Sequence, residues 1–231
     1  MRASAHLSLL FALLFTAGFG VAQVNHGQWV SYRDAYRTMV AFEKYGKAKH
    51  LIQHHLQVMP KDKSLAAEGL QLSLLGKSTS LNLPLDATGR TVFPLLKAAY
   101  DENAALVLNR KVSEHLFRAR ISIVVRPDGV YESGDLRSAC EQALAYQRSV
   151  DASLRAGACA GVRFVFARGT TDPGVRVRKG EGEALSMLDG PAFPGDPYEA
   201  FRVVNYRFGA VVEKTHVVTQ NPPLAITPIF Q

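Results

Sequence analysis

Apolar and polar residues alternate in short runs between residues 49 and 131, and this period of two is typical of β-strands. The expected strands cover residues 49–59, 70–74, 81–85, 91–93, 105–109 and 115–126. Turn-forming residues separate these runs, as at 86–90 and at Pro127-Asp128-Gly129. Strands spaced about 8–12 residues apart predict antiparallel sheets in a sandwich or barrel.

Two segments have the helical period instead. Apolar residues recur every three or four positions from Tyr32 to Tyr45, after Ser31 as a possible N-cap and before Gly46. A second amphipathic stripe follows over 135–149. A short helix is also expected within residues 94–101.

The last third of the chain returns to the strand pattern. Strands are expected at 162–167 and 175–178, and 201–208 and 210–218 suggest a hairpin that turns near Gly209. The tail 222–228 contains three prolines, which favours an edge strand because proline cannot donate a ladder hydrogen bond. We therefore predict a β-dominated α+β fold, with antiparallel, sandwich-like sheets and two or three helices.

The first residues have the pattern of a secretory signal peptide. Arg2 precedes a short apolar run over 7–15, and small residues at Gly20 and Ala22 fit the positions that a signal peptidase accepts. Cleavage is expected after Ala22. A membrane anchor would need about 20 apolar residues, and this run is shorter. The remaining chain, 23–231, is expected to be a single periplasmic domain with a soft boundary near residue 132 and no transmembrane anchor.

The composition is that of a globular protein with a basic surplus. The formal net charge is +7 and the isoelectric point is about 9.5. Association with anionic envelope components is one reading of this surplus, and ordinary solubility is the other. Nucleic-acid binding is not expected in this compartment, and no recognised motif supports it.

The two cysteines, Cys140 and Cys159, suggest a disulfide in an exported protein. A straight helix to Leu154 would place its end ~21 Å beyond Cys140, and five extended residues reach at most ~17 Å. A bridge needs the two Cα atoms within about 7 Å. A disulfide therefore requires the helix to end early, near Ser149, and we predict both features together.

Arginines form the most suggestive polar pattern. Arg118 and Arg120 share one face of an expected strand, and Arg176 and Arg178 share one face of another. If these faces coincided, the clustered guanidiniums would recognise phosphate or carboxylate groups. A solvated outer sheet face explains the same pattern, so both interpretations stay open.

Histidines offer a weaker metal hypothesis. His50 and His54 could supply two ligands from one face, but no third or fourth ligand follows at a recognised spacing. We expect no cofactor. The sequence also lacks a nucleophile elbow, a zinc-protease motif and a phosphate loop.

Two longer motifs resemble a known family. The run 83–90, followed by Phe93-Pro94-Leu95-Leu96 and Glu102-Asn103-Ala104, and the run 135–143 resemble a family of uncharacterised exported proteobacterial proteins that share a domain of unknown function. The resemblance implies a bacterial periplasmic location and no particular activity. Our leading hypothesis is a non-enzymatic binding or scaffolding protein for an anionic envelope component or protein partner. The alternative is an envelope hydrolase whose residues converge only in the folded chain.

Overall fold

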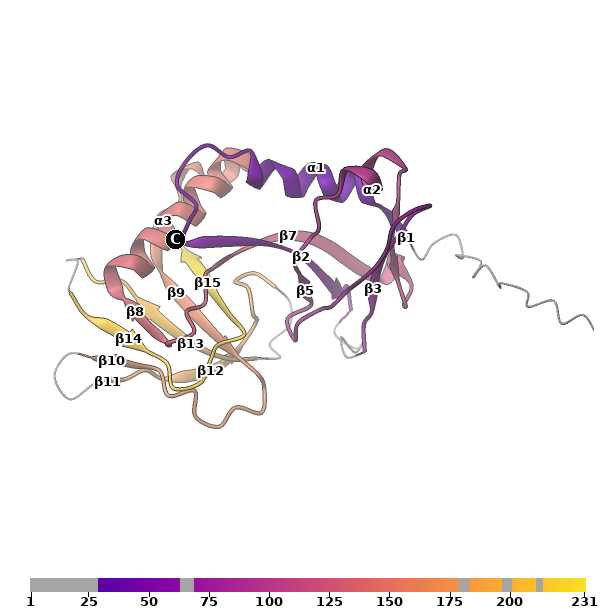
Figure 1. The fold of residues 1–231 in the computed structure, drawn as a ribbon. Coiled ribbons are helices and arrows are strands. Elements are labelled where there is room, and N and C mark those ends of the chain that lie inside the picture. The colour runs from indigo at the N-terminus through magenta and orange to yellow at the C-terminus, as the bar shows by residue number, and fades with distance from the viewer. Residues whose placement is uncertain (1–28, 63–68, 179–182, 197–200, 211–213) are drawn as a thin grey trace, which may run out of the picture.

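The computed structural model describes residues 29–62, 69–178, 183–196, 201–210 and 214–231. Its strands form three antiparallel sheets, joined by the helices α1 (Tyr32–Glu43), α2 (Lys97–Asp101) and α3 (Ser133–Val150). The predicted β-dominated α+β class is therefore confirmed. Figure 1 shows α1 and α3 along one side of the molecule, above the long strands of the largest sheet.

The largest sheet has seven strands and spans both halves of the molecule. In spatial order they are β12 (Met187–Gly190), β13 (Phe201–Arg207), β9 (Cys159–Phe166), β15 (Ala225–Phe230), β7 (His115–Ile123), β2 (Ile52–Pro60) and β5 (Arg90–Thr91). Each half of this sheet packs face to face against a smaller four-stranded sheet, with apolar side chains between them.

The first small sheet contains β1 (Trp29–Ser31), β6 (Ala105–Leu108), β3 (Leu72–Leu75) and β4 (Ser80–Leu83). The second contains β11 (Glu183–Ala184), β10 (Arg176–Arg178), β14 (His216–Val218) and β8 (Val130–Glu132). In both small sheets the alternation in the sequence has the same cause: successive side chains of a strand point to opposite faces, so every second one points to the core.

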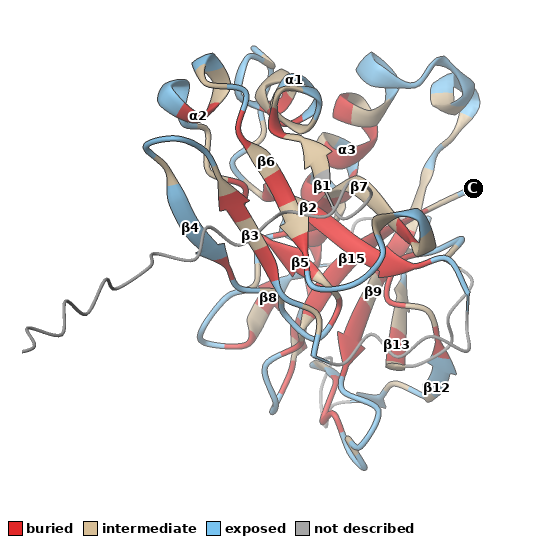
Figure 2. Cartoon of the chain, turned by 90° about the vertical axis from the view of Figure 1, so that its right-hand side faces the viewer, coloured by how far each residue is buried: buried red, intermediate tan, exposed pale blue. Residues whose placement is uncertain are grey.

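Two main apolar cores follow from this layering. In the first, Tyr32 and Met39 of α1 pack with Leu56 of β2 and with leucines of the first small sheet. In the second, α3 packs on the sheet side chains Phe164 and Ile226. A smaller cluster with Phe42 and Tyr146 joins the two cores, so the halves share apolar contacts. Figure 2 shows the buried residues concentrated along the strands.

The seven-stranded sheet forks between β7 and β15. Strand β7 pairs with β2 along all of its 9 residues. In contrast, it pairs with β15 only at Ile123 and Ile226. Beyond this pair the two strands separate, and in the described part of the chain no other strand pairs with the open edge of β7. The fork shapes the site described below.

The position of the C-terminal strand corrects one prediction. Residues 225–230 do not form an edge strand, because β15 lies between β9 and β7 inside the sheet. Pro228 is tolerated there because Ile226 pairs with β7, and alternate residues of a strand point to the same edge. The nitrogen of Pro228 thus faces the fork, where no ladder hydrogen bond is lost.

The predicted hairpin at Gly209 is also wrong. Strand β13 lies between β12 and β9 in the large sheet, whereas β14 pairs with β10 and β8 in a small sheet. The residues before β14 are tied to α3 instead, because the Ser133 N–H donates to the Thr215 carbonyl over 2.9 Å. Strand β14 covers only His216–Val218 of the predicted 210–218, so its length and its partner both differ from the prediction, and residues 211–213 lie outside the described residues.

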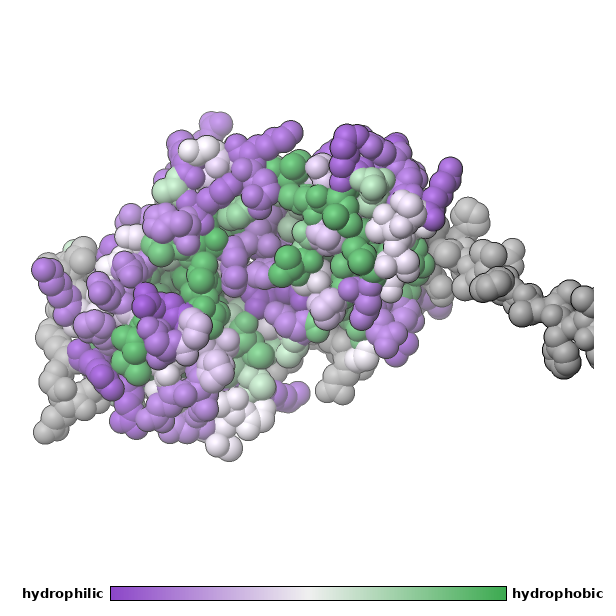
Figure 3. Space-filling view, in the orientation of Figure 1, coloured by the Kyte–Doolittle hydropathy of each residue, from purple (hydrophilic) through white to green (hydrophobic). Residues whose placement is uncertain are grey.

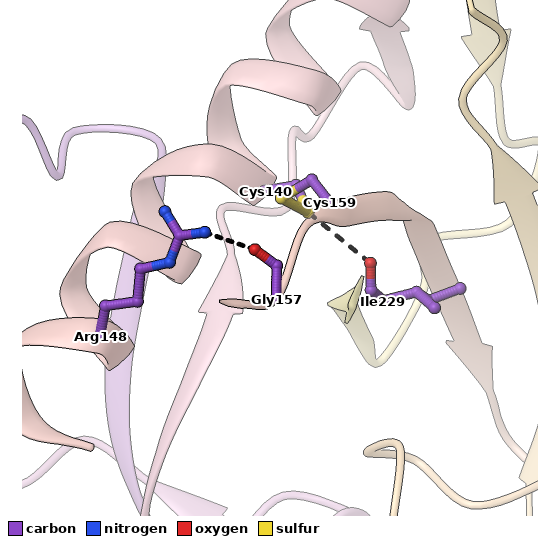
Figure 4. The surroundings of a disulfide bond; sticks show 5 residues. All are labelled: Cys140, Arg148, Gly157, Cys159 and Ile229. Atoms are coloured by element: carbon purple, nitrogen blue, oxygen red, sulfur yellow. Dashed lines mark hydrogen bonds between the residues drawn. A yellow bond between two sulfur atoms is a disulfide. The ribbon is translucent and has the colours of Figure 1, made fainter. Parts of the chain in front are cut away.

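The disulfide and the early helix end are both confirmed. Helix α3 ends at Val150, and Cys140 is bonded to Cys159 with the Cα atoms 6.0 Å apart. A short 3-10 helix, Ala152–Ala156, turns the chain back toward β9. Figure 4 shows Arg148 donating to the Gly157 carbonyl on this return path. The sulfur of Cys140 lies 3.9 Å from the Ile229 carbonyl oxygen, so the bridge sits beside β15.

Candidate functional site

Arg118 and Arg120 converge on one carboxylate. Both project from the same face of β7, and both pair with Asp196 from the loop that follows β12. The Arg118 Nη1 lies 3.5 Å from Asp196 Oδ1, and Arg120 also donates its Nε–H to the Gln57 amide oxygen over 2.7 Å. The Asp196 side chain is only 4% exposed, whereas Arg118 is 41% exposed and Arg120 is 18% exposed. The structure thus brings together two of the four predicted arginines.

A third arginine, Arg90, lies buried behind this pair. It forms a 2.8 Å ion pair with Asp86 and donates to Ser122 Oγ and to the Leu224 carbonyl over 3.0 and 2.7 Å. The ring of Phe193 lies near both guanidiniums, with its centroid 5.7 Å from Arg90 Cζ and 4.8 Å from Arg120 Cζ. The sequence of residues 86–90 predicts only a turn, so it gives no indication that Arg90 belongs to the site.

The local sequence explains how Arg90 reaches the sheet. Asp86 Oδ1 accepts hydrogen bonds from the backbone N–H groups of Thr88 and Arg90, which closes the turn. Gly89 has a φ of +76°, and a Cβ there would collide with the carbonyl of Val58. Glycine is therefore needed where the turn pairs with β2.

The Asp196 loop is fixed to the same sheet face. Arg163 donates to the Pro191 carbonyl over 3.0 Å, and Thr227 Oγ1 donates to the Ala192 carbonyl over 3.3 Å. Burial raises the pKa of the Asp196 carboxyl, and the neighbouring guanidiniums of Arg120 and Arg118 only partly oppose this effect. The loop therefore places an acceptor against two guanidiniums in a partly dehydrated setting.

A cavity of about 660 Å³ fills the fork between β7 and β15. Its lining is mainly apolar and comes from α1, β7, the end of α3, the Asp196 loop and β15; it includes Ala41, Ile121, Tyr146, Val150, Phe193, Pro228 and Phe230. Its polar groups come from Thr38, His54, Arg120, Gln147, Asp151 and Thr227. Figure 3 shows apolar side chains on both sides of a polar strip in the middle of this face.

A second cavity of about 590 Å³ continues along β7 beneath α1. It is lined by Phe117 and Arg118, and it shares Thr38 and Ala119 with the first cavity. Together the two cavities follow the unpaired edge of β7. We call them the fork groove.

His54 lies in the aromatic wall of the groove. Its ring lies 5.0 Å from that of Phe42 and 5.9 Å from that of Tyr146, measured between centroids. Burial, the largest cause, and the neighbouring His55 lower its pKa from 6.5 to about 4, and a hydrogen bond with the Met39 backbone only partly opposes them. The imidazole is therefore neutral at neutral pH.

We expect this histidine to make the fold sensitive to mild acid. The folded pKa of about 4 lies below the ordinary value of 6.5, so as the pH falls the unfolded chain takes up a proton at His54 before the folded chain does. The free energy of unfolding is therefore highest above pH 6.5 and decreases as the pH falls toward 4. Between about pH 7 and about pH 5 the free energy of unfolding should fall by about 2 kcal/mol. Urea unfolding over this range measures it. His54→Phe should remove most of the decrease, whereas His50→Asn, at an exposed position, should keep it.

The other predicted site residues lie elsewhere. Arg176 and Arg178 are exposed on β10, in the second small sheet, so they do not join Arg118 and Arg120. His50 is exposed in the turn before β2, outside the strand that carries His54. No cluster of three or more potential metal ligands occurs among the residues that the structure describes. Within that part of the chain, neither histidine has the further ligands that a zinc site needs.

Comparison with known proteins gives no relative: no known family, no curated protein and no solved structure matches the chain. Within the described ranges no helix combines the length and apolarity needed to cross a membrane. The predicted signal peptide, residues 1–22, lies outside the described residues. The site must therefore be interpreted from its own geometry.

Proposed function

We propose that the protein is a non-enzymatic binding protein for an anionic envelope partner, and that Arg118 and Arg120 recognise the anionic group. The observation that supports this most directly is the pairing of both guanidiniums with Asp196. The chain here supplies its own carboxylate to a site whose geometry suits such a group. Within this group of three the two arginines outnumber the one aspartate, while Asp151 and Asp34 line other parts of the groove.

The groove extends this preference to ligands with an apolar part. Arg120 lies at a cavity whose other walls are mainly apolar, including Ile121, Phe193 and Phe230. A site with a few placed polar groups on an apolar lining is typical of ligand binding. The favoured ligand therefore joins a carboxylate, phosphate or sulfonate to an apolar body.

The alternative function, an envelope hydrolase, receives less support from this groove. His54 lines the first cavity, and no serine or cysteine is among the described residues that line that cavity; Ser31 lines only the second cavity. The hydroxyl of Thr227 already donates to a backbone carbonyl of the Asp196 loop. A general base without an adjacent nucleophile or oriented partner does not make a hydrolytic site.

We also propose that the protein acts in the periplasm. The signal-peptide pattern of residues 1–22 supports export, and the Cys140–Cys159 bond fits an oxidising compartment. Cell fractionation and the N-terminal sequence of the purified protein would test this. A mature chain that begins at Gln23 is the expected result.

A fluorescent anion with an apolar body tests the binding function. We expect anilinonaphthalene sulfonate to bind the folded protein with saturation and with an affinity that falls as salt rises. Arg118→Ser with Arg120→Ser should raise its dissociation constant at least about tenfold, because the charged donors are lost. Fluorescence titration measures this change, with circular dichroism to confirm folding.

The matched control replaces the other arginine pair. Arg176→Ser with Arg178→Ser removes the same net charge from an exposed strand outside the groove, so the dissociation constant should stay within about twofold. Equal weakening by both double variants would show that only the overall charge matters. Unchanged binding in the Arg118 and Arg120 variant would refute the proposed function.

A further inference from the structure

We infer that the fork groove accepts an extended peptide of a partner protein, which adds a strand to the open edge of β7 and places acidic side chains against Arg118 and Arg120. This inference rests on the proposed function and names the class of partner. It is carried by the free backbone edge in the fork, by the continuous groove beside it and by the charge of one face of β7.

Among the residues that the structure describes, some backbone donors and acceptors of β7 have no strand partner. The N–H of Val124 donates to the Leu51 carbonyl over 3.0 Å, so the even-numbered positions point toward β2. The odd-numbered positions Phe117, Ala119 and Ile121 point their N–H and C=O groups toward the opposite edge. In the described chain this edge meets β15 only at Ile123. Unpaired strand edges are templates for pairing with another chain.

The groove has the length of a short strand. The run from Phe117 to Ile121 spans about 16 Å at 3.3 Å per residue. Both cavities lie along it and share the lining residues Thr38 and Ala119. An extended segment of about five or six residues would therefore fit beside β7, with α1 on one side and the Asp196 loop on the other.

The two faces of β7 specify the side chains of this segment. Arg118 and Arg120 lie on one face, and after binding Asp196 and Gln57 they keep further N–H donors. On the other face, Ala119 and Ile121 lie beside α1 at an apolar wall. Because side chains of a strand alternate between faces, the matching peptide alternates acidic and apolar residues.

The experiment uses the whole folded protein and a synthetic peptide of about six residues in which glutamate and valine alternate. Fluorescence anisotropy of the labelled peptide should show saturable binding. Amide exchange followed by NMR should slow at Phe117, Ala119 and Ile121 when the peptide is added. Arg118 and Arg120 are internal controls, because their amides already face β2 in the sheet.

Two variants separate strand pairing from charge recognition. Ala119→Pro removes an N–H that faces the fork and should weaken peptide binding at least about tenfold, whereas Ala119→Ser keeps that N–H and should bind within about twofold. A peptide N-methylated at alternate residues should bind the unsubstituted protein at least about tenfold more weakly than its unmodified parent does. This second comparison holds even if the proline variant does not fold.

The outcomes distinguish this inference from the proposed function. One outcome is that binding of the sulfonate probe requires Arg118 and Arg120, while the N-methylated peptide binds as tightly as its unmodified parent. This outcome would support the proposed anion binding and would contradict the addition of a peptide strand to β7. A free protein that sediments as a dimer, with the odd-numbered amides already protected, would assign the edge to a second copy and overturn the peptide inference. Slowed exchange confined to these amides, in a monomer, supports it.

Discussion

Asp86→Asn is expected to lower the free energy of unfolding by about 3 kcal/mol, because it leaves a buried guanidinium without its counter-ion. The Arg90 side chain is only 3% exposed, and Asp86 Oδ2 accepts from both its Nε and its Nη2. An amide at this position would present N–H groups to these donors. Urea unfolding at neutral pH measures the change.

The isosteric amide makes this test specific. Asp86 Oδ1 accepts from the backbone N–H groups of the turn, and asparagine can keep these bonds. Loss of the turn is therefore not the expected cause. What is lost is the charge next to Arg90, whose remaining partners, such as Ser122 and the Leu224 carbonyl, are neutral.

A second aspartate provides the control. Asp128 pairs with Arg126 at 3.1 Å, but the two side chains are 53% and 49% exposed. Asp128→Asn should therefore leave the stability almost unchanged, since water screens and replaces such a pair. If both variants lost the same stability, the burial of Arg90 would not be the reason, and the account of the Asp86 site would be wrong.

Sequence patterns predicted the local elements of this fold well. The helical period of residues 32–45 corresponds to α1, and that of 135–149 corresponds to α3. The cysteine spacing predicted the end of α3 because chain length and bond geometry limit how far residues 150–159 can reach. Each of these inferences depended on residues close together in the chain.

Partners that are distant in sequence could not be predicted in the same way. The sequence predicted extended segments at 210–218 and 222–228, which overlap the observed β14 and β15, but it carries no information about which strand lies beside each of them. The prolines of the tail favoured an edge, and the fork, which makes Pro228 acceptable inside a sheet, depends on how β7 and β15 diverge. Strand order is a property of the whole chain.

For the same reason, only part of the candidate site could be predicted from the sequence. The shared parity of Arg118 and Arg120 follows from the period of a strand, so their common face could be predicted. Asp196 lies 76 residues from Arg120, and nothing in the local sequence connects them. Arg90 had a signal, since it closes an Asp-Ala-Thr-Gly-Arg turn, but a turn alone gives no reason to expect a buried charge.

Replacing both cysteines by alanine is expected to lower the free energy of unfolding by about 3 kcal/mol. The bond closes a segment with a sequence separation of 19, and its loss restores conformational freedom to the unfolded chain. Alanine suits the buried position of Cys140, which has no exposed surface. Urea unfolding of oxidised protein and of Cys140→Ala with Cys159→Ala gives the comparison.

Reduction of the unsubstituted protein separates the cross-link from the side chains. Under a thiol reductant it should lose nearly the same stability as the double variant, whereas the double variant should not respond. The end of α3 should also become less protected against amide exchange, because Tyr146, Gln147 and Val150 lie beyond the bridge on this helix and line the fork groove. A double variant as stable as the oxidised protein would mean that packing of α3 on β9 and β15 suffices without the bond. The disulfide would then not be needed to hold this wall of the groove.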